Sequence, residues 1–144
     1  MPQRSPDVAS PVRRTEADRL RLLEDAVERL REQAEFGTVV VEGLRDRAAL
    51  EWLGIGGIHI HLNQGDPMAR LLEELAAAAP PVILLMDWDR TGGRLSAHLE
   101  ENLRARVQVD IDCRRRFASC CHSKTLEEVP AELEALRRSV GVRP

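Results

Sequence analysis

The stretch "VILLMDWDRTGG", residues 82–93, decides the fold class, because an apolar run ends there in two aspartates and two glycines. Asp87 and Asp89 are separated by one residue, so in an extended chain their side chains project to the same side, about 7 Å apart. Two negative charges that close together are unfavourable unless a cation or a proton lies between them. The stretch therefore predicts a site at the end of a buried strand.

Other apolar runs of strand length lie on both sides of this stretch, and helical patterns separate them. The strands are predicted at 38–42, 57–63, 80–87 and 107–112, and the intervening helices at 46–54, 66–79 and 92–106. Strands that alternate with helices in this way are typical of a parallel sheet with helices on its faces. We therefore predict an α/β protein with a Rossmann-like fold, whose four-stranded, mostly parallel sheet is flanked by helices, with an extra N-terminal helix.

The two ends of the chain carry different patterns. Residues 1–14 are rich in Pro, Ser and Arg and predict a disordered tail, whereas residues 15–36 predict a helix capped by Thr15. Residues 126–144 predict a C-terminal helix that packs on the domain and begins at Thr125 or near Pro130. The N-terminal helix has one apolar stripe, which either packs on the domain or pairs with a second copy in a homodimer. The stripe consists of Leu20, Leu23, Val27, Leu30 and Ala34.

The composition argues against several classes of protein. The formal net charge of −3 does not by itself indicate a nucleic-acid or membrane partner. No segment reaches the roughly 18 uninterrupted apolar residues of a membrane span, and the N-terminus lacks the apolar centre of a signal peptide. Three cysteines do not suggest a secreted disulfide framework. We expect a cytoplasmic protein without a membrane partner.

Acidic residues follow the first strand as well as the third. Glu42 ends the first strand, Gly43 allows a sharp turn beside it, and Asp46 begins a helix. Because ligands of such sheets bind at the carboxyl ends of the strands, Glu42 should lie beside Asp87 and Asp89. Three converging carboxylates form an oxygen-rich cluster suited to Mg²⁺ or Mn²⁺. The sequence therefore predicts a divalent metal held by Glu42, Asp87 and Asp89.

Basic residues accompany these acids and predict phosphate contacts. Gly92 and Gly93 precede a helix, whose N-terminal N–H groups favour anions. A basic cluster near the end of the fourth strand would attract a polyanionic backbone. The predicted phosphate or nucleic-acid contacts are Arg90, Arg94, Arg114, Arg115, Arg116 and Lys124.

Together these motifs resemble the Toprim domain of bacterial-type primases, topoisomerases and several nucleases. The glutamate-glycine pair at Glu42 and Gly43 and the D-x-D motif at Asp87 and Asp89 stand in the Toprim order, and the resemblance covers residues 37–125. It implies that Glu42 acts as a general acid or base and that the aspartates bind Mg²⁺. The resemblance also implies that the protein is a nuclease or a nucleotidyl-transfer protein that acts on phosphodiester bonds of RNA or DNA. A role in RNA processing falls within this class. The chain has no tyrosine, which excludes a complete topoisomerase.

Two other functions fit the same residues. A Toprim-like module can bind or scaffold nucleic acid without catalysis. The letters "DWDRT" also match the D-x-D-x-T motif of haloacid-dehalogenase-type phosphatases, in which Asp87 would be the nucleophile and Lys124 the later lysine. Two groups of residues are candidates for a second metal, although surface and core roles suit them better. They are the pair His59 and His61 and the group Cys113, Cys120, Cys121 and His122.

Overall fold

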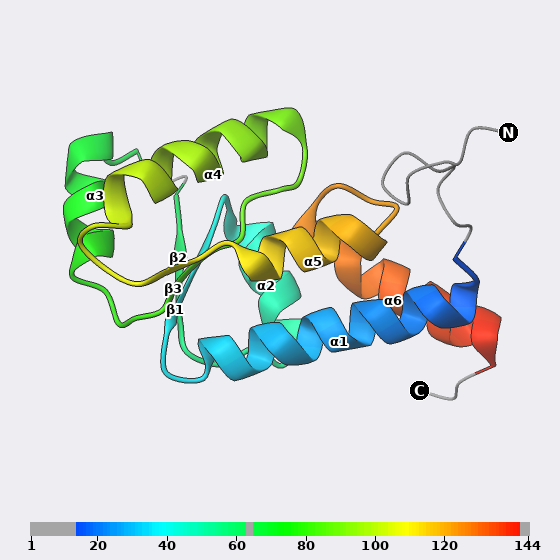
Figure 1. Ribbon diagram of the computed structural model, residues 1–144. Coiled ribbons are helices and arrows are strands. Elements are labelled where there is room, and N and C mark those ends of the chain that lie inside the picture. Colours follow the sequence, from blue (N-terminus) through cyan, green and yellow to red (C-terminus); the bar gives the residue numbers. More distant parts are fainter. Residues whose placement is uncertain (1–13, 63–64, 142–144) are drawn as a thin grey trace, which may run out of the picture.

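The computed structural model describes residues 14–62 and 65–141 (Figure 1). Almost all of the predicted tail, 1–14, lies outside the described residues, as do the last residue of the predicted second strand and residues 142–144 of the predicted C-terminal helix. The description that follows concerns the rest of the chain.

Four parallel strands form one sheet in the order β2-β1-β3-β4. Their bounds are β1 Thr38–Val41, β2 Ile58–His61, β3 Val82–Leu84 and β4 Val109–Asp110. The predicted fold class is confirmed, although each strand is shorter than its apolar run. In β3 the run continues through Leu85 and Met86, which are buried, but regular pairing ends at Leu84. Asp87 therefore follows the strand instead of ending it.

Helices cover both faces of the sheet (Figure 1). Their bounds are α1 Glu16–Ala34, α2 Leu44–Trp52, α3 Met68–Ala76, α4 Arg90–Leu103, α5 Asp112–Cys120 and α6 Val129–Val140, with a short 3₁₀ turn, η1, at Leu126–Glu128. Helix α5 was not predicted, because its residues were interpreted only as a basic cluster and candidate metal ligands. The C-terminal helix begins near Pro130, as one of the two alternatives had it.

Two apolar cores hold the layers together, one on each face of the sheet. Val40 and Leu84 point toward α3 and α4, whereas Val39 and Ile83 point toward α1, α2, α5 and α6. This alternation follows from the strand period of two. Because both faces are covered, the two central strands, β1 and β3, are fully buried and almost entirely apolar, so polar chemistry is left to the ends of these strands.

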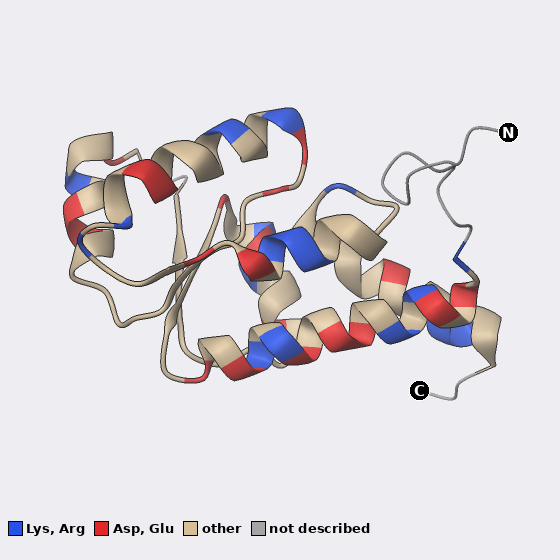
Figure 2. Ribbon diagram, in the orientation of Figure 1, with Lys and Arg blue, Asp and Glu red and all other residues tan. Residues whose placement is uncertain are grey.

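The apolar stripe of α1 is buried within the chain. Leu23, Leu30 and Ala34 are fully buried, and α1 packs against α5 and α6. Figure 2 shows that acidic and basic residues alternate along its outer surface. The stripe is thus not available to a second helix, and of the two alternatives the structure shows packing on the domain. None of the helices in the described ranges combines the length and apolar character that a membrane span needs.

A carboxylate cluster with arginines at the carboxyl edge of the sheet

Glu42 and Asp87 meet where two neighbouring strands end. Glu42 directly follows β1, and Asp87 lies three residues beyond the end of β3, which pairs with β1. The main-chain N–H of Asp87 donates to Oε2 of Glu42 at 2.8 Å. The structure therefore brings together the two motifs that stand 45 residues apart in the sequence.

The carboxyl group of Asp87 is partly buried among other acids. Its Oδ1 accepts a hydrogen bond from the main-chain N–H of Leu126 at 3.1 Å. Burial raises the pKa of Asp87 to about 6; the Leu126 N–H opposes this rise, and the negative charges of Glu42, Asp46 and Asp89 add to it. The charges of three other carboxylates therefore act on Asp87 in addition to its burial.

Asp46 is the fourth acid of this cluster and is fixed by the turn after β1. Its Oδ2 accepts from the main-chain N–H of Gly43 at 3.0 Å, a bond that closes the first turn of α2. The residue is only 7% exposed, and burial raises the pKa of its carboxyl group. Asp46 thus combines a capping role with a place beside Glu42 and Asp87.

Asp89 is the N-cap of α4 and not a strand residue. Its Oδ1 accepts from the main-chain N–H of Gly92 at 2.7 Å. Gly92 itself must be glycine, because a Cβ atom there would lie 1.9 Å from the carbonyl oxygen of Asp87. The second aspartate and the first glycine of the motif therefore fold the chain tightly around Asp87.

Arg114, from the helix that sequence reasoning missed, is the best-placed cation. Its Nε donates to the carbonyl oxygen of Met86 at 3.0 Å, and its Nη2 donates to that of Asp87 at 2.8 Å. Glu42, Asp87 and Asp89 all act electrostatically on its guanidinium group. Arg114 therefore supports the loop that carries Asp87 and offsets part of the negative charge.

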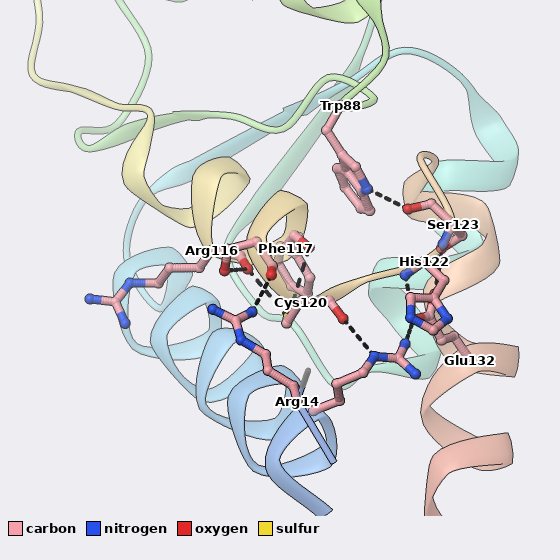
Figure 3. A network of polar contacts seen from close by, with 10 residues as sticks. Arg14, Trp88, Arg116, Phe117, Cys120, His122, Ser123 and Glu132 are labelled. Carbon is pink, nitrogen blue, oxygen red and sulfur yellow. Dashed lines mark hydrogen bonds and ion pairs between the residues drawn. The ribbon is translucent and has the colours of Figure 1, made fainter. Parts of the chain in front are cut away.

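The other predicted basic residues lie in different places. Arg115 lines a hollow of about 120 Å³ beside Arg114 and Gly93. Arg116 is two residues along α5, about 200° around the helix from Arg114, and pairs with Asp112 at 2.7 Å. Figure 3 shows its side chain directed away from Trp88 and the loop that follows α5. Arg116 is thus not brought to the cluster with Arg114.

Arg90 and Arg94 are exposed on the first two turns of α4, one turn apart. The side chain of Lys124 is exposed as well, and its carbonyl oxygen accepts from the main-chain N–H of Trp88 at 2.9 Å. These three cations surround the site without contacting the carboxylates in the described part of the chain.

A polar network fixes the loop between α5 and η1 between Trp88 and Glu132 (Figure 3). Trp88 stacks on Phe117, as expected of a core residue, and its Nε1 donates to the carbonyl oxygen of Ser123 at 2.7 Å. Ser123 in turn donates its Oγ–H to Glu132 at 2.7 Å. Glu132 also accepts from Arg19 and from the main-chain N–H groups of residues 122 and 123. The network connects α1 and α6 to the segment that presents Asp87.

A cleft of about 390 Å³ opens beside the acids. Glu42, Asp46 and Asp87 line it together with Arg45, His61 and Glu127. Arg45 and Glu127 were missed as site residues, and His61 was considered only for a second metal, although a signal placing it beside Glu42 was available. Because β2 pairs in parallel with β1, its last residue must lie at the same edge as Glu42.

The two sets of residues considered for a second metal have other surroundings. His59 Nε2 lies 3.0 Å from the carbonyl oxygen of Gly56, and His59 is not among the residues that line the cleft with His61. Cys113 and Cys120 are buried in the core, as expected of small apolar residues. Within the described ranges, no group of three His, Cys, Asp or Glu side chains forms a preformed metal cage.

The cluster nevertheless has the donor chemistry that Mg²⁺ requires. The hydrogen bonds between described residues use one oxygen each of Glu42, Asp87 and Asp89, namely Oε2, Oδ1 and Oδ1. A hard cation that keeps most of its waters needs only one or two carboxylates, and no cage. The negative charges of Glu42, Asp46 and Asp89, which act on Asp87, would attract a cation there. The residues therefore fit a hydrated Mg²⁺ ion at Glu42 and Asp87, with Asp89 beside them.

The fold and the site together define an α/β protein with a carboxylate cluster at the carboxyl edge of a parallel sheet. Comparison with known proteins gives the family. The chain is 30% identical over 128 residues to a UPF0292 protein of Methanosarcina acetivorans, covering 86% of this chain and 88% of that protein. It is 33% identical over 116 residues to a UPF0292 protein of Pyrococcus furiosus, covering 79% and 86%. The chain therefore belongs to the UPF0292 family.

A solved structure has a similar fold. A putative protein from Aquifex aeolicus matches with a TM-score of 0.61 and 28% identity, over 74% of this chain and 96% of that one. No family model matches the sequence. The UPF0292 name states no activity, so the function has to follow from the residues of the site.

Proposed function

We propose that this protein is a Mg²⁺-dependent enzyme of the Toprim type that acts on phosphodiester bonds of nucleic acid. The observation that carries the proposal is the contact of Glu42 with Asp87, which unites the glutamate-glycine and D-x-D motifs at one sheet edge. The further acids Asp46 and Asp89 and the cation Arg114 support it, because they surround that contact with charges of both signs.

Each acid has a distinct part in this chemistry. Asp87 and Glu42 would hold the ion, and Asp89 would hold one of its waters while capping α4. When bound, Mg²⁺ polarises a phosphoryl oxygen and stabilises the leaving oxygen. Glu42 would move the proton between the attacking hydroxyl group or water and the leaving group. The N–H of Asp87 holds Glu42 in place for that transfer.

The arginines would position the polyanion. Arg114 lies beside the carboxylates, and Arg115 lines the adjoining hollow at the start of α4. Backbone phosphates bound there would make affinity fall with salt. Arg90, Arg94 and Lys124 would extend this contact along the exposed rim. A cytoplasmic location belongs to the same proposal, since all three cysteines are free thiols.

The test is metal-dependent cleavage of labelled structured RNA, single-stranded DNA and duplex DNA. The wild type is compared with Glu42→Gln, with the double variant Asp87→Asn/Asp89→Asn, and with Asp25→Asn. Asp25 is an exposed acid of α1 and controls for the loss of one negative charge. We expect Mg²⁺- or Mn²⁺-dependent products that fall at least about 100-fold in the first two variants and not in the control, as expected when an acid–base group is lost.

Other outcomes separate the alternatives. Salt-sensitive binding without cleavage would support a non-catalytic nucleic-acid-binding or scaffolding module. If the protein neither binds nor cleaves any of the three nucleic acids, the proposal is overturned. Hydrolysis of small phosphate monoesters at Asp87 is then favoured. A thermal-unfolding titration with Mg²⁺ adds a readout that does not depend on substrate. The wild type should be stabilised by the ion and Asp87→Asn should not.

A further inference from the structure

The cleft beside the carboxylates is also lined by an ion pair. Glu42 and Asp87 line this space of about 390 Å³, and so do Arg45 and Glu127. Arg45 belongs to the first turn of α2, whereas Glu127 belongs to η1, 82 residues later. A molecule in the cleft would therefore meet a cation as well as the acids.

Arg45 and Glu127 form an ion pair that is easily exchanged. Nη1 of Arg45 lies 3.4 Å from Oε1 of Glu127, and the two side chains are 84% and 48% exposed. A long, exposed pair of this kind adds little to stability, because water screens it and two long side chains must be ordered. A phosphate group offers Arg45 two oxygens at once and is a stronger partner than this carboxylate.

The position of Arg45 is unfavourable for the helix that carries it. A cation in the first turn of a helix opposes the positive end of the helix dipole, and α2 would be more stable with an acid there. No other ion pair or hydrogen bond of its side chain is formed with the described residues. Residues that break a local rule without a structural gain are found most often at functional sites.

Arg114 is less free than Arg45 to move toward a phosphate in the cleft, because two of its five N–H groups already donate to the main chain. It donates to two carbonyl oxygens of the chain, at Met86 and Asp87, and it is partly buried. Moving it to a phosphate would release the loop that presents Asp87. Within the described residues Arg45 holds no main-chain group in this way, and it lines the same cleft as Asp87.

We propose that Arg45 binds a backbone phosphate of the nucleic-acid substrate in the cleft, and that Glu127 competes with that phosphate for Arg45. The inference rests on the proposed function and adds a specificity-determining pair to its site. Without nucleic acid, Glu127 holds Arg45. When a phosphate enters, Arg45 leaves the Glu127 carboxylate and binds the phosphate instead. The Glu127 carboxylate then repels other anions that are too far from Arg45 to bind it.

The two side chains therefore have opposite effects on binding, which a structural ion pair would not have. The experiment measures dissociation constants by fluorescence anisotropy with labelled single-stranded DNA, a hairpin RNA and duplex DNA, in Mg²⁺ and over a series of salt concentrations. The Glu42→Gln protein is used as the background so that the probe stays intact. The added substitutions are Arg45→Gln, Glu127→Gln and both together.

We expect Arg45→Gln to weaken binding about tenfold and to reduce the slope of log K against log salt by about 0.7 to 0.9, the value for one lost phosphate contact. Glu127→Gln should tighten binding, and the gain should largely disappear when Arg45 is also replaced. Arg47→Gln, an exposed arginine half a turn along α2, and Glu128→Gln, the neighbouring acid, control for general charge effects.

Equal effects of Arg45→Gln and Arg47→Gln would overturn the inference and leave the proposed function intact. Weaker binding by Glu127→Gln, or a gain that persists without Arg45, would overturn it as well. If the wild type binds none of the three nucleic acids, the proposed function is wrong and the inference falls with it. Urea unfolding of each variant shows whether a change in binding comes from a loss of folding.

Discussion

The main-chain N–H of Asp87 donates to the Glu42 carboxylate at 2.8 Å and so ties together the ends of two adjacent parallel strands. This bond uses the peptide group of one acid to orient the side chain of the other. Glutamine keeps an oxygen acceptor at the same distance, so Glu42→Gln removes the charge and the proton-transfer group while the local geometry is kept. A loss of activity in that variant therefore reports on chemistry.

The double role of Asp89 can be separated by two substitutions. Asparagine caps helices as well as aspartate does, whereas alanine does not, and a lost cap costs about 1 kcal/mol. We therefore expect Asp89→Asn to unfold at the same urea concentration as the wild type and Asp89→Ala to be about 1 kcal/mol less stable. Both should lose Mg²⁺-dependent activity, because both lack the charge. Activity retained in Asp89→Asn would show that the residue serves only as a cap.

The titration of Asp87 should make the stability of the metal-free protein depend on pH. Burial, with the charges of Glu42, Asp46 and Asp89, raises its pKa from 3.8 to about 6 in the folded protein. The unfolded chain releases this proton first, so the carboxyl group favours folding below pH 3.8, and that contribution is lost as the pH rises through about 6.

Compared with Asp87→Asn, the wild type in EDTA should therefore lose unfolding free energy between about pH 4 and pH 7. Urea unfolding at a series of pH values measures this difference. Mg²⁺ should restore the lost stability at the upper end of the range, because it favours the ionised carboxylate. Parallel pH curves for the two proteins would mean that Asp87 titrates normally.

Replacement by alanine should change the unfolding free energy differently at the two glycines at the start of α4. At Gly92 a Cβ atom would lie 1.9 Å from the Asp87 carbonyl oxygen, whereas at Gly93 the nearest atom, Nη2 of Arg114, is 3.5 Å away. Gly92→Ala should lower the unfolding free energy by about 2 kcal/mol or more, since the backbone must shift. Gly93→Ala should be neutral or stabilise the protein by up to about 1 kcal/mol, the usual gain inside a helix. Chemical denaturation of the two variants measures both changes in unfolding free energy. Equal changes would contradict the close approach at Gly92.

Glu132 should matter for stability and for the environment of Trp88. Its side chain is 12% exposed, pairs with Arg19 and accepts from Ser123, so Glu132→Ala leaves several partly buried groups without this partner. We expect a loss of about 3 kcal/mol, within the usual range for breaking a buried pair. Glu134→Ala removes an exposed acid one turn from Arg138 on the same helix and should change stability by less than about 0.5 kcal/mol.

The emission of Trp88 provides the second readout for Glu132. Its indole N–H donates to the carbonyl oxygen of Ser123, which Glu132 holds in place. In a Trp52→Phe background, where Trp88 is the single tryptophan, Glu132→Ala should shift the emission and Glu134→Ala should not. Unchanged emission would mean that the loop keeps its position without Glu132.

The sheet could be predicted from the sequence because four short apolar runs alternate with amphipathic helices. The contact of Glu42 with Asp87 followed from the rule that parallel strands end at one edge. Helix α5 escaped prediction, since its buried stripe contains only Cys113, Phe117 and Cys120, set among three arginines. The spacing of four and three residues in that stripe was the available signal.

Two features of the site depend on tertiary geometry that no local pattern carries. Asp89 was expected on a strand beside Asp87, but the strand ends early and the chain turns so that Asp89 caps a helix. Arg45 and Glu127 come together only because η1 is folded back onto α2 through contacts between distant segments. A sequence pattern can place residues on an edge, but it cannot show which of them face each other across a cleft.

The packing of α1 against α5 and α6 has a consequence for synthesis on the ribosome. The first helix is made before its two main helical partners, which begin at residue 112. The part of its apolar stripe that α5 and α6 cover therefore stays exposed to water, or to a chaperone, until most of the chain has emerged, since domains fold as units once their residues are available. Ribosome-bound chains that end before residue 112 should be cleaved within α1 by added protease, whereas released full-length chains should resist.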